Sequence, residues 1–404
     1  MKRPTSLIAA SGFLAGALAV TAPAEDWPRW RGTNFDGISK ENHWLKQWPA
    51  SGPRQLWKAE VGVGWSSLSV AEGRAFTMGN TEEVDSVYGF DAATGKLLWQ
   101  HQYDCSSKDP NGYPGPRVTP TVDGDRVYSL SRQGHLFCLE AATGKVRWSR
   151  EFVKDFGAKV PTWGFSGSPL IEGNWVIVET GATGASVVAL DKLTGDVVWK
   201  AGDDPVGYSS IVPFDHAGQR SLAVFSAAGI VGRSARDGKE LWRHPWKTSW
   251  DVNAATPIVH DGKVFISSGY NKGCALVDFS GGAAKVVWEH KKMRNHVATC
   301  VLLDGHLYGF DESAFKCLDW ATGEERWSSP KYGKGSLMLA GDRFIVFSDK
   351  GRVAVVEPSP TELKEVAGFQ ALTGKDTWAA PVLANGRLYC RAGKDLVCLD
   401  VKAN

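Results

Sequence analysis

The sequence has almost no excess charge of either sign, because its 404 residues carry 46 Lys and Arg against 44 Asp and Glu. The first 24 residues contain two of the basic residues and none of the acidic ones, so the remainder is balanced. A balanced chain lacks the basic surface that nucleic acid or an anionic membrane would need, and we expect neither as a partner. After residue 24 no apolar run reaches the roughly 20 residues of a membrane-spanning helix. We therefore expect no transmembrane segment in the mature chain.

The short motifs of common catalytic and metal sites are also missing. The seven Cys include no Cys-Cys pair and no C-x-x-C, and the nine His show no H-x-H or H-E-x-x-H spacing. There is no G-x-S-x-G elbow and no P-loop. An odd number of Cys leaves at least one unpaired. Cys138, Cys317 and Cys398 occupy equivalent places in LFCLE, FKCLD and LVCLD, which favours small buried strand residues.

The N-terminus has the pattern of an export signal. Lys2 and Arg3 precede an Ala-rich apolar run at 7–20, which is too short to span a membrane, and the A-x-A pattern at 22–24 follows. We predict that residues 1–24 are a signal peptide cleaved after Ala24. The predicted location is periplasmic, with secretion as the alternative. No Cys directly follows the apolar run, so we do not expect a lipid anchor.

The dominant feature that is present is an internal repeat of about 40–50 residues. DAATGKLLW at 91–99 returns as EAATGKVRW at 140–148, and each copy begins a short run that ends in Trp. The repeat tryptophans are Trp57, Trp99, Trp148, Trp199, Trp242, Trp288 and Trp327, and a degenerate copy at 361–369 lacks the Trp. Upstream of each turn, paired β-prone runs predict a hairpin, as in TPTVDGDRVYSL at 119–130. Four strands per repeat are typical of a β-propeller blade.

The residues of the D-x-x-T-G turn have structural reasons to be there. Gly95 can adopt a positive φ, and Asp91 can accept backbone N–H groups across the turn. Trp99 can bury its ring against the neighbouring blade. We therefore interpret the motif as a structural turn and not as a ligand signature.

Both ends of the chain are predicted to complete one ring. Residues 378–401 supply three strands without a fourth, and residues 54–61 supply a single strand with none before it. Pairing the two segments closes the ring and removes its open edge. The prediction is an all-β, eight-bladed β-propeller of four-stranded blades over residues 54–404. An extension at 25–53 would lie across one face, and we expect a monomer.

The A-x-D-x-x-T-G-x-x-x-W repeats over 54–401 resemble the quinoprotein-type, PQQ-like repeat propellers. That group includes quinoprotein alcohol dehydrogenases and the BamB-type component of outer-membrane β-barrel assembly. DWPRWRG at 26–32 and KKMRNHVATC at 291–300 are similar to exported BamB-like proteins. The BamB resemblance implies envelope or outer-membrane protein partners and no cofactor, whereas the dehydrogenase resemblance implies PQQ with calcium. The chain lacks the vicinal Cys pair and the Glu, Asn and Asp set of the dehydrogenases, and it lacks the lipidation Cys usual in BamB proteins.

The loops of a propeller lie on two faces, and only one of these varies between repeats. The D-x-x-T-G turns share the uniform face, while the starts of the inner strands share the variable face, where function usually lies. The position three before the repeat's Pro holds Trp65, Arg117, Ser166, Tyr208, Ala254, Val297, Lys334 and Trp378. We expect this ring to line the mouth of the central channel. Long links add Tyr113, Lys159 and Trp163 nearby.

Aromatic and basic residues in this ring could bind a flat or anionic ligand. The candidate cofactor-binding residues are Trp65, Arg117, Tyr208, Asn253, Arg294, His296, Lys334 and Trp378. The alternative is that the aromatic rings plug the channel. We predict no catalytic residue and no metal ligand.

Three functions follow from these observations. We favour an exported, non-catalytic scaffold that binds envelope proteins, in the manner of outer-membrane assembly. The first alternative is a PQQ- or quinone-dependent alcohol or sugar dehydrogenase. The second alternative is a propeller that binds carbohydrate through its aromatic residues.

Overall fold

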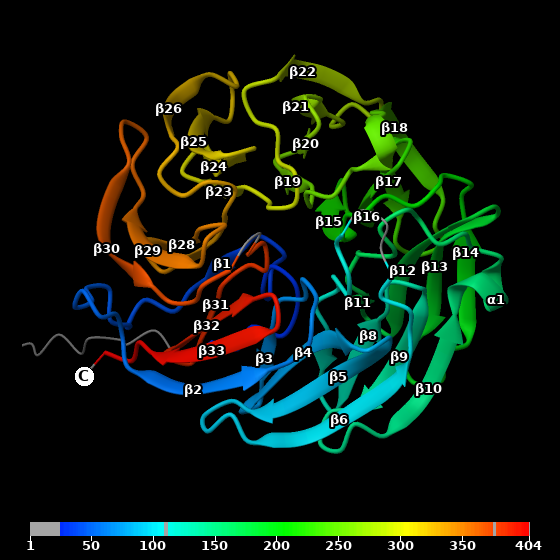
Figure 1. The fold of residues 1–404 in the computed structure, drawn as a ribbon. Coiled ribbons are helices and arrows are strands. Elements are labelled where there is room, and N and C mark those ends of the chain that lie inside the picture. The colour runs from blue at the N-terminus through cyan, green and yellow to red at the C-terminus, as the bar shows by residue number, and fades with distance from the viewer. Residues whose placement is uncertain (1–24, 109–111, 375–376, 404) are drawn as a thin grey trace, which may run out of the picture.

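The computed structural model describes residues 25–108, 112–374 and 377–403, which form a ring of eight four-stranded antiparallel blades (Figure 1). Four consecutive strands build each of seven blades, from a short inner strand to an exposed outer strand. These strands are β3 (Ser69–Ala71), β4 (Arg74–Thr81), β5 (Val84–Asp91), β6 (Leu97–Asp104), β7 (Thr121–Asp123), β8 (Arg126–Leu130), β9 (His135–Glu140), β10 (Val146–Glu151), β11 (Leu170–Glu172), β12 (Trp175–Ala182), β13 (Ala185–Asp191), β14 (Val197–Ala201), β15 (Val212–His216), β16 (Gln219–Ser226), β17 (Gly229–Ser234), β18 (Glu240–Pro245), β19 (Ile258–His260), β20 (Lys263–Ser268), β21 (Gly273–Asp278), β22 (Lys285–His290), β23 (Val301–Leu303), β24 (His306–Asp311), β25 (Ala314–Asp319), β26 (Glu325–Ser329), β27 (Ser336–Ala340), β28 (Arg343–Phe347), β29 (Arg352–Glu357) and β30 (Lys364–Gln370).

The eighth blade joins the two ends of the chain. It contains β31 (Val382–Ala384), β32 (Arg387–Ala392), β33 (Asp395–Asp400) and β2 (Gln55–Glu60), in the order β2-β33-β32-β31. The N-terminal strand β2 pairs antiparallel with the C-terminal strand β33, as the blue and red ribbons of Figure 1 show. The predicted fold class and the predicted ring closure are confirmed.

The repeat tryptophans pack between blades, as their residue type predicts. Trp99 on β6 is buried, and its indole N–H donates to the Ala141 carbonyl of the next blade at 2.9 Å. Gly144 makes room for the ring, since a Cβ there would lie 2.4 Å from it, and Gly144 also has a φ of +72°. Losing such a buried ring removes about 3–5 kcal/mol of stability.

The turn before Trp99 has the predicted hydrogen bonds. The backbone N–H groups of Ala93 and Thr94 donate to the Asp91 carboxylate at 3.1 and 2.8 Å. In the degenerate copy Phe369 replaces the Trp and packs edge-on against Trp48, with ring centroids 5.5 Å apart. The structural interpretation of the motif therefore agrees with its contacts.

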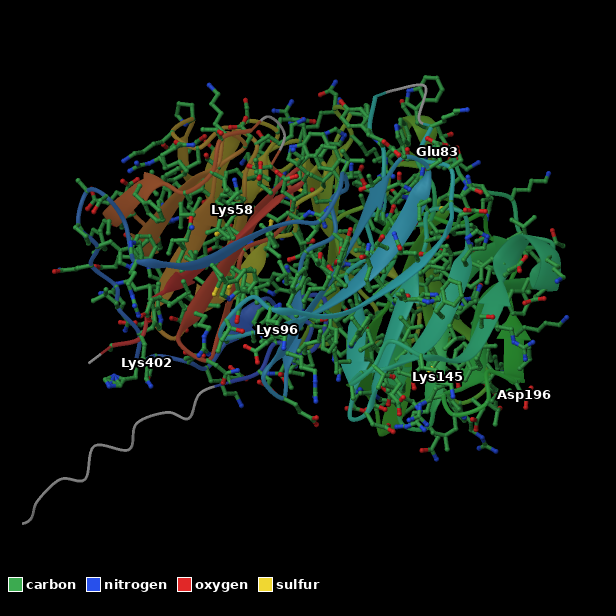
Figure 2. The ribbon with its side chains drawn as sticks, turned by 60° about the horizontal axis from the view of Figure 1, so that its bottom comes forward. Lys58, Glu83, Lys96, Lys145, Asp196 and Lys402 are labelled. Carbon is green, nitrogen blue, oxygen red and sulfur yellow. The ribbon has the colours of Figure 1, made fainter. Side chains whose placement is uncertain are left out.

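The two faces of the ring are separated as the strand directions require. In Figure 2, Lys96, Lys145 and Asp196 lie toward the lower edge, and each directly follows the Gly of a D-x-x-T-G or E-x-x-T-G turn. Glu83, in the loop between the second and third strands of its blade, lies at the opposite edge. We call this second face the variable face.

The N-terminal extension enters the centre of the ring. Its strand β1 (Ile38–Ser39) pairs in parallel with β27, the innermost strand of its blade. The sequence did not predict β1, because a strand of two residues that pairs through its backbone is too short to show an alternation of polar and apolar side chains. Trp27 forms a bridge with Val70 of the inner strand β3, and buried Arg31 donates to the Cys300 carbonyl at 2.9 Å. The extension thus links inner strands from different blades.

The described residues contain little helical structure, and their cysteines are buried. The helices are α1 (Phe152–Phe156) and the 3-10 turn η1 (Ser249–Asp251), and none in the described residues is long and apolar enough to cross a membrane. All seven Cys are buried and free. Cys138, Cys317 and Cys398 lie on strands, and each of the three is fully buried, as predicted.

Candidate functional site

The central channel widens on the variable face into a cavity of about 150 Å³, which is space for roughly five water molecules at about 30 Å³ each. The predicted ring position lines this cavity in every blade except the one that carries Lys334. Five of the candidate residues therefore come together here, and they are Trp65, Arg117, Tyr208, His296 and Trp378. Tyr113 and Trp163 from the long links also line it.

One wall of the cavity is a stack of aromatic rings. Trp65 and Trp378 lie face to face, with ring centroids 4.9 Å apart and planes at 27°. Tyr113 extends the stack over Trp378 at 5.5 Å and 30°. The indole N–H groups of Trp65 and Trp378 are buried and have no hydrogen-bond partner among the described residues. A buried donor without a partner is unfavourable, so both indole N–H groups are available to donate a hydrogen bond to an acceptor on a bound ligand.

The opposite wall and the rim carry further aromatic rings. Trp163 meets Tyr208 edge-on at 5.8 Å and Trp250 at 6.5 Å. Trp250 is 67% exposed, and Tyr270, which also lines the cavity, is 42% exposed. Both residues have positive φ, 64° and 51°, a backbone conformation that bulky residues rarely adopt. Such conformations concentrate at functional sites.

The floor of the cavity comes from the N-terminal extension. Trp30 lines the cavity, and its indole N–H donates to the Thr256 hydroxyl at 2.8 Å. The sequence predicts only that the extension at 25–53 lies across one face of the propeller. Its entry into the channel could not be predicted, because the extension has no counterpart in the repeats.

Lys334 and His296 form a polar pair beside the stack. Lys334 Nζ donates to His296 Nδ1 at 2.8 Å and also pairs with Glu312 at 3.2 Å. Burial, helped by the Lys334 charge, lowers the pKa of His296 to about 4, while Glu312 opposes this shift. The imidazole is therefore neutral at pH 7, with its proton on Nε2. Lys334 lies 6.0 Å from the ring centroid of Trp378, so it borders the cavity without being part of its lining.

Every polar side chain in the lining can donate a hydrogen bond, and the hydroxyl groups can also accept one. The Arg117 guanidinium donates to the Tyr113 carbonyl at 2.7 Å and to the Gly115 carbonyl at 3.2 Å. The described lining residues include Ser and Thr hydroxyls but no carboxylate.

Asn253 and Arg294 do not line the cavity. Asn253 is fully buried, and its amide donates to the Ser226 and Trp246 carbonyls at 2.8 and 3.1 Å. Arg294 forms a bidentate pair with Asp311, at 2.7 and 2.9 Å. Both side chains hold loops in place instead of facing the channel.

The two stacked rings leave no gap for a quinone between them, and no described carboxylate lines the cavity. Within residues 25–108, 112–374 and 377–403 there is no group of three or more His, Cys, Asp or Glu that could hold a metal ion. A planar ring placed between Trp65 and Trp378 would need two contacts of about 3.5 Å, or roughly 7 Å between the two ring planes. The observed centroid separation of 4.9 Å leaves no such gap.

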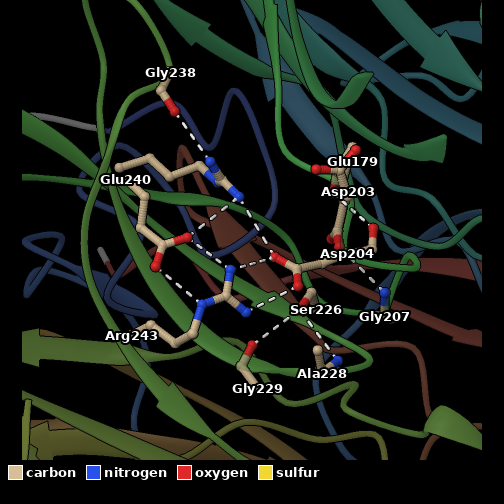
Figure 3. A network of polar contacts seen from close by, with 12 residues as sticks. Glu179, Asp203, Asp204, Gly207, Ser226, Ala228, Gly229, Gly238, Glu240 and Arg243 are labelled. Atoms are coloured by element: carbon tan, nitrogen blue, oxygen red, sulfur yellow. Dashed lines mark hydrogen bonds and ion pairs between the residues drawn. The ribbon is translucent and has the colours of Figure 1, made fainter. Parts of the chain in front are cut away.

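A second polar cluster lies outside the cavity, between the β11–β14 and β15–β18 blades (Figure 3). Arg243 pairs with Asp204 at 2.9 Å and with Glu240 at 2.6 Å, and the buried Arg233 reaches Asp204 at 3.4 Å. Nearby, Glu179 accepts a hydrogen bond from the Gly207 backbone at 3.2 Å. This network fixes the link between two blades.

Comparison with known proteins identifies one matching family model, described as outer membrane protein assembly factor BamB, over residues 83–329. This match covers more than half of the chain. The BamB of Burkholderia pseudomallei is 24% identical over 355 residues, which are 81% of this chain and 85% of that protein. The 1-butanol dehydrogenase (quinone) of Thauera butanivorans is 30% identical over 149 residues, which are 32% of this chain. The chain covers only 23% of the length of that dehydrogenase.

Solved structures show the same fold in both groups. BamB from Moraxella catarrhalis superposes with a TM-score of 0.61 at 17% identity, over 87% of this chain and 98% of that chain. A europium-containing methanol dehydrogenase superposes with a TM-score of 0.67 at 14% identity, over 91% and 90%. At these identities the likeness concerns the fold alone, so the site must distinguish the roles.

Proposed function

The chain belongs to the family described as outer membrane protein assembly factor BamB, and on that premise we propose that it is an exported, non-catalytic scaffold for envelope proteins. The proposal locates partner binding at the aromatic rim and cavity of the variable face. It includes a periplasmic location, because the predicted signal peptide at 1–24 precedes the described residues. It also treats the protein as a monomer with no nucleic-acid partner.

The observation that carries this proposal is the exposure of aromatic rings around an apolar cavity. Trp250 is 67% exposed and contacts Trp163 of the cavity lining, while Tyr270 is 42% exposed and lines the cavity itself. Large exposed aromatics beside a concave apolar surface are typical of protein-binding hot spots. A partner segment with an apolar or aromatic side chain fits this mouth, since that side chain can enter the cavity while its backbone meets the rim.

The test is site-specific photo-crosslinking in the cell envelope. A photoreactive amino acid replaces Trp250 at the rim, and in the matched control it replaces Leu193, which is 54% exposed on the uniform face. We expect one reproducible protein adduct from position 250 that is absent from position 193. No adduct at position 250, or the same adducts from both positions, would contradict the proposal.

A quinone-dependent oxidoreductase is the second candidate. The stacked Trp65 and Trp378 in the channel, together with the similarity to quinone-dependent 1-butanol dehydrogenase, favour it. It would have to hold the quinone without the metal, and the two rings would have to separate. When bound, a quinone would accept the two electrons of alcohol oxidation. Dye-linked oxidation of alcohols or sugars after incubation with PQQ, lost in Trp378→Ala, would support this candidate, and background rates would remove it.

A further inference from the structure

The extension contains a buried carboxylate that lacks a cation. Glu41 is 3% exposed, and its oxygens accept backbone N–H groups from Asn385, at 2.8 Å, and from Gly386. In the part of the chain that the structure describes, no Lys, Arg or His pairs with Glu41. Burial raises the pKa of the Glu41 carboxyl above its ordinary value, because the charged form is poorly solvated there. An anion at such a place is costly unless a positive charge accompanies it.

The nearest nitrogen that could become positive is that of the backbone of Glu25. It lies 3.4 Å from Glu41 Oε2. In the unprocessed chain this nitrogen is a neutral amide. Hydrolysis of the Ala24–Glu25 peptide bond by water, catalysed by a signal peptidase, would leave a carboxylate on Ala24 and an amine on Glu25. At neutral pH that amine takes up a proton, because its ordinary pKa is about 8.

We propose that removal of residues 1–24 completes the fold, by placing the new α-ammonium of Glu25 in an ion pair with the buried carboxylate of Glu41. Two separate observations meet at this bond. The A-x-A pattern predicts cleavage after residue 24 from the sequence alone. The position of the Glu25 nitrogen beside an uncompensated carboxylate comes from the packing of the extension.

The surrounding charges favour the ammonium. The Glu25 carboxylate accepts a hydrogen bond from the Ser39 hydroxyl at 2.9 Å, and Asp26 accepts one from Asn385 Nδ2 at 2.8 Å. Asp36 also interacts electrostatically with Glu25. The side chain of Lys40 is exposed. Four carboxylates therefore face this region, so we expect the pKa of the α-ammonium to be raised above its ordinary value.

The pair would consolidate the segment that carries the cavity floor. Glu41 holds the turn at 385–386 between β31 and β32, in the blade that closes the ring. Trp30, eleven residues before Glu41, forms the floor of the channel cavity. Processing thus ties the extension to the closing blade at the point where the chain begins. This inference is independent of what the cavity binds.

The test compares three proteins: residues 25–404 beginning at Glu25, the same chain with Gly-Ser added before Glu25, and the E41Q variant of the first. An amine-reactive N-hydroxysuccinimide ester at pH 7.5 reports the α-amine, and mass spectrometry follows its labelling. Each unit by which the pKa rises lowers the reactive neutral fraction tenfold. We expect labelling at least about tenfold slower in the first protein than in the other two. Equal labelling rates in the first protein and the extended chain would overturn the proposal.

A second measurement does not depend on the E41Q variant being folded. A group with a raised pKa stabilises the fold below its unfolded pKa, and that stabilisation is lost as pH rises through the folded pKa. At pH 7 the chain that begins at Glu25 should melt about 2 °C above the Gly-Ser-extended chain. This difference should disappear at pH values well above the folded pKa. Identical melting temperatures at pH 7, or a difference that persists unchanged at high pH, would contradict the ion pair.

Discussion

Glu179 should make the protein less stable as pH rises toward neutrality. It lies on β12 and is 8% exposed, and burial raises the pKa of its carboxyl from the ordinary 4.5 to about 8, with Asp204 adding to the rise and Arg233 opposing it. Between these two pKa values the folded protein holds a proton that the unfolded chain releases. The folded state therefore binds more protons, and the free energy of unfolding falls as pH increases from about 4.5 to 8.

The expected size of this effect follows from the shift. Each pKa unit is worth about 1.4 kcal/mol, so a gap of about 2.5 units between 4.5 and pH 7 costs about 3 kcal/mol at pH 7. Glu179→Gln keeps the shape and can still accept the hydrogen bond from Gly207, but it does not ionise. We expect the variant to be about 3 kcal/mol more stable than the wild type at pH 7, and to exceed it by less than about 1 kcal/mol at pH 5.

Urea denaturation at pH 5, 6, 7 and 8, followed by tryptophan fluorescence, measures this difference. The exposed Glu324, in the turn between β25 and β26, provides the matched control Glu324→Gln. The control should follow the wild-type pH dependence. If Glu179→Gln also runs parallel to the wild type across this range, the buried proton is absent and the reasoning fails.

Two further substitutions test the packing of the ring. Gly144→Ala should destabilise the protein more than Gly124→Ala. Both glycines have positive φ, so either substitution costs about 1–2 kcal/mol, but only a Cβ at 144 would meet the Trp99 ring, which adds about 1–3 kcal/mol. Equal losses of stability in chemical denaturation would show that the contact with the Trp99 ring does not add to the cost. Asp204→Ala removes an acidic partner of the buried Arg233 and should cost about 3 kcal/mol, measured in the same way, whereas a loss below about 1 kcal/mol would mean that the remaining pair suffices.

The fold was largely predictable because each blade repeats the same physical solution. Trp99 and Gly144 are needed together, and the recurring Trp marks seven of the eight blades in the sequence. The single strand predicted at 54–61 indicated how the ring closes, because an isolated strand has to pair with other strands, and the C-terminal three strands lacked a fourth. The path of the extension was not predictable in this way. The positions of β1 and Trp30 depend on how the extension runs through the channel, and no repeated sequence pattern corresponds to that path.

Much of the candidate site was predictable because the repeats place equivalent residues at the starts of the inner strands. Trp65, Arg117, Tyr208 and Trp378 occupy the ring position and line the cavity. Asn253 stands one residue earlier, and its amide is fully engaged by backbone carbonyls away from the channel. Position in a repeat could not reveal that difference. The rim residues Trp250 and Tyr270 lie in a blade link and in a loop between strands, and their exposure depends on local backbone conformation.

The proposed role implies that this channel does not bind a quinone together with calcium, and one titration tests that claim most directly. Purified protein beginning at Glu25 is titrated with PQQ, with and without calcium, while tryptophan fluorescence is recorded. Because Trp65 and Trp378 are stacked on each other and no described carboxylate lines the cavity, we predict no saturable, calcium-dependent quenching. Saturable quenching at micromolar PQQ that requires calcium and disappears in Trp378→Ala would contradict the account and favour a quinone-dependent enzyme.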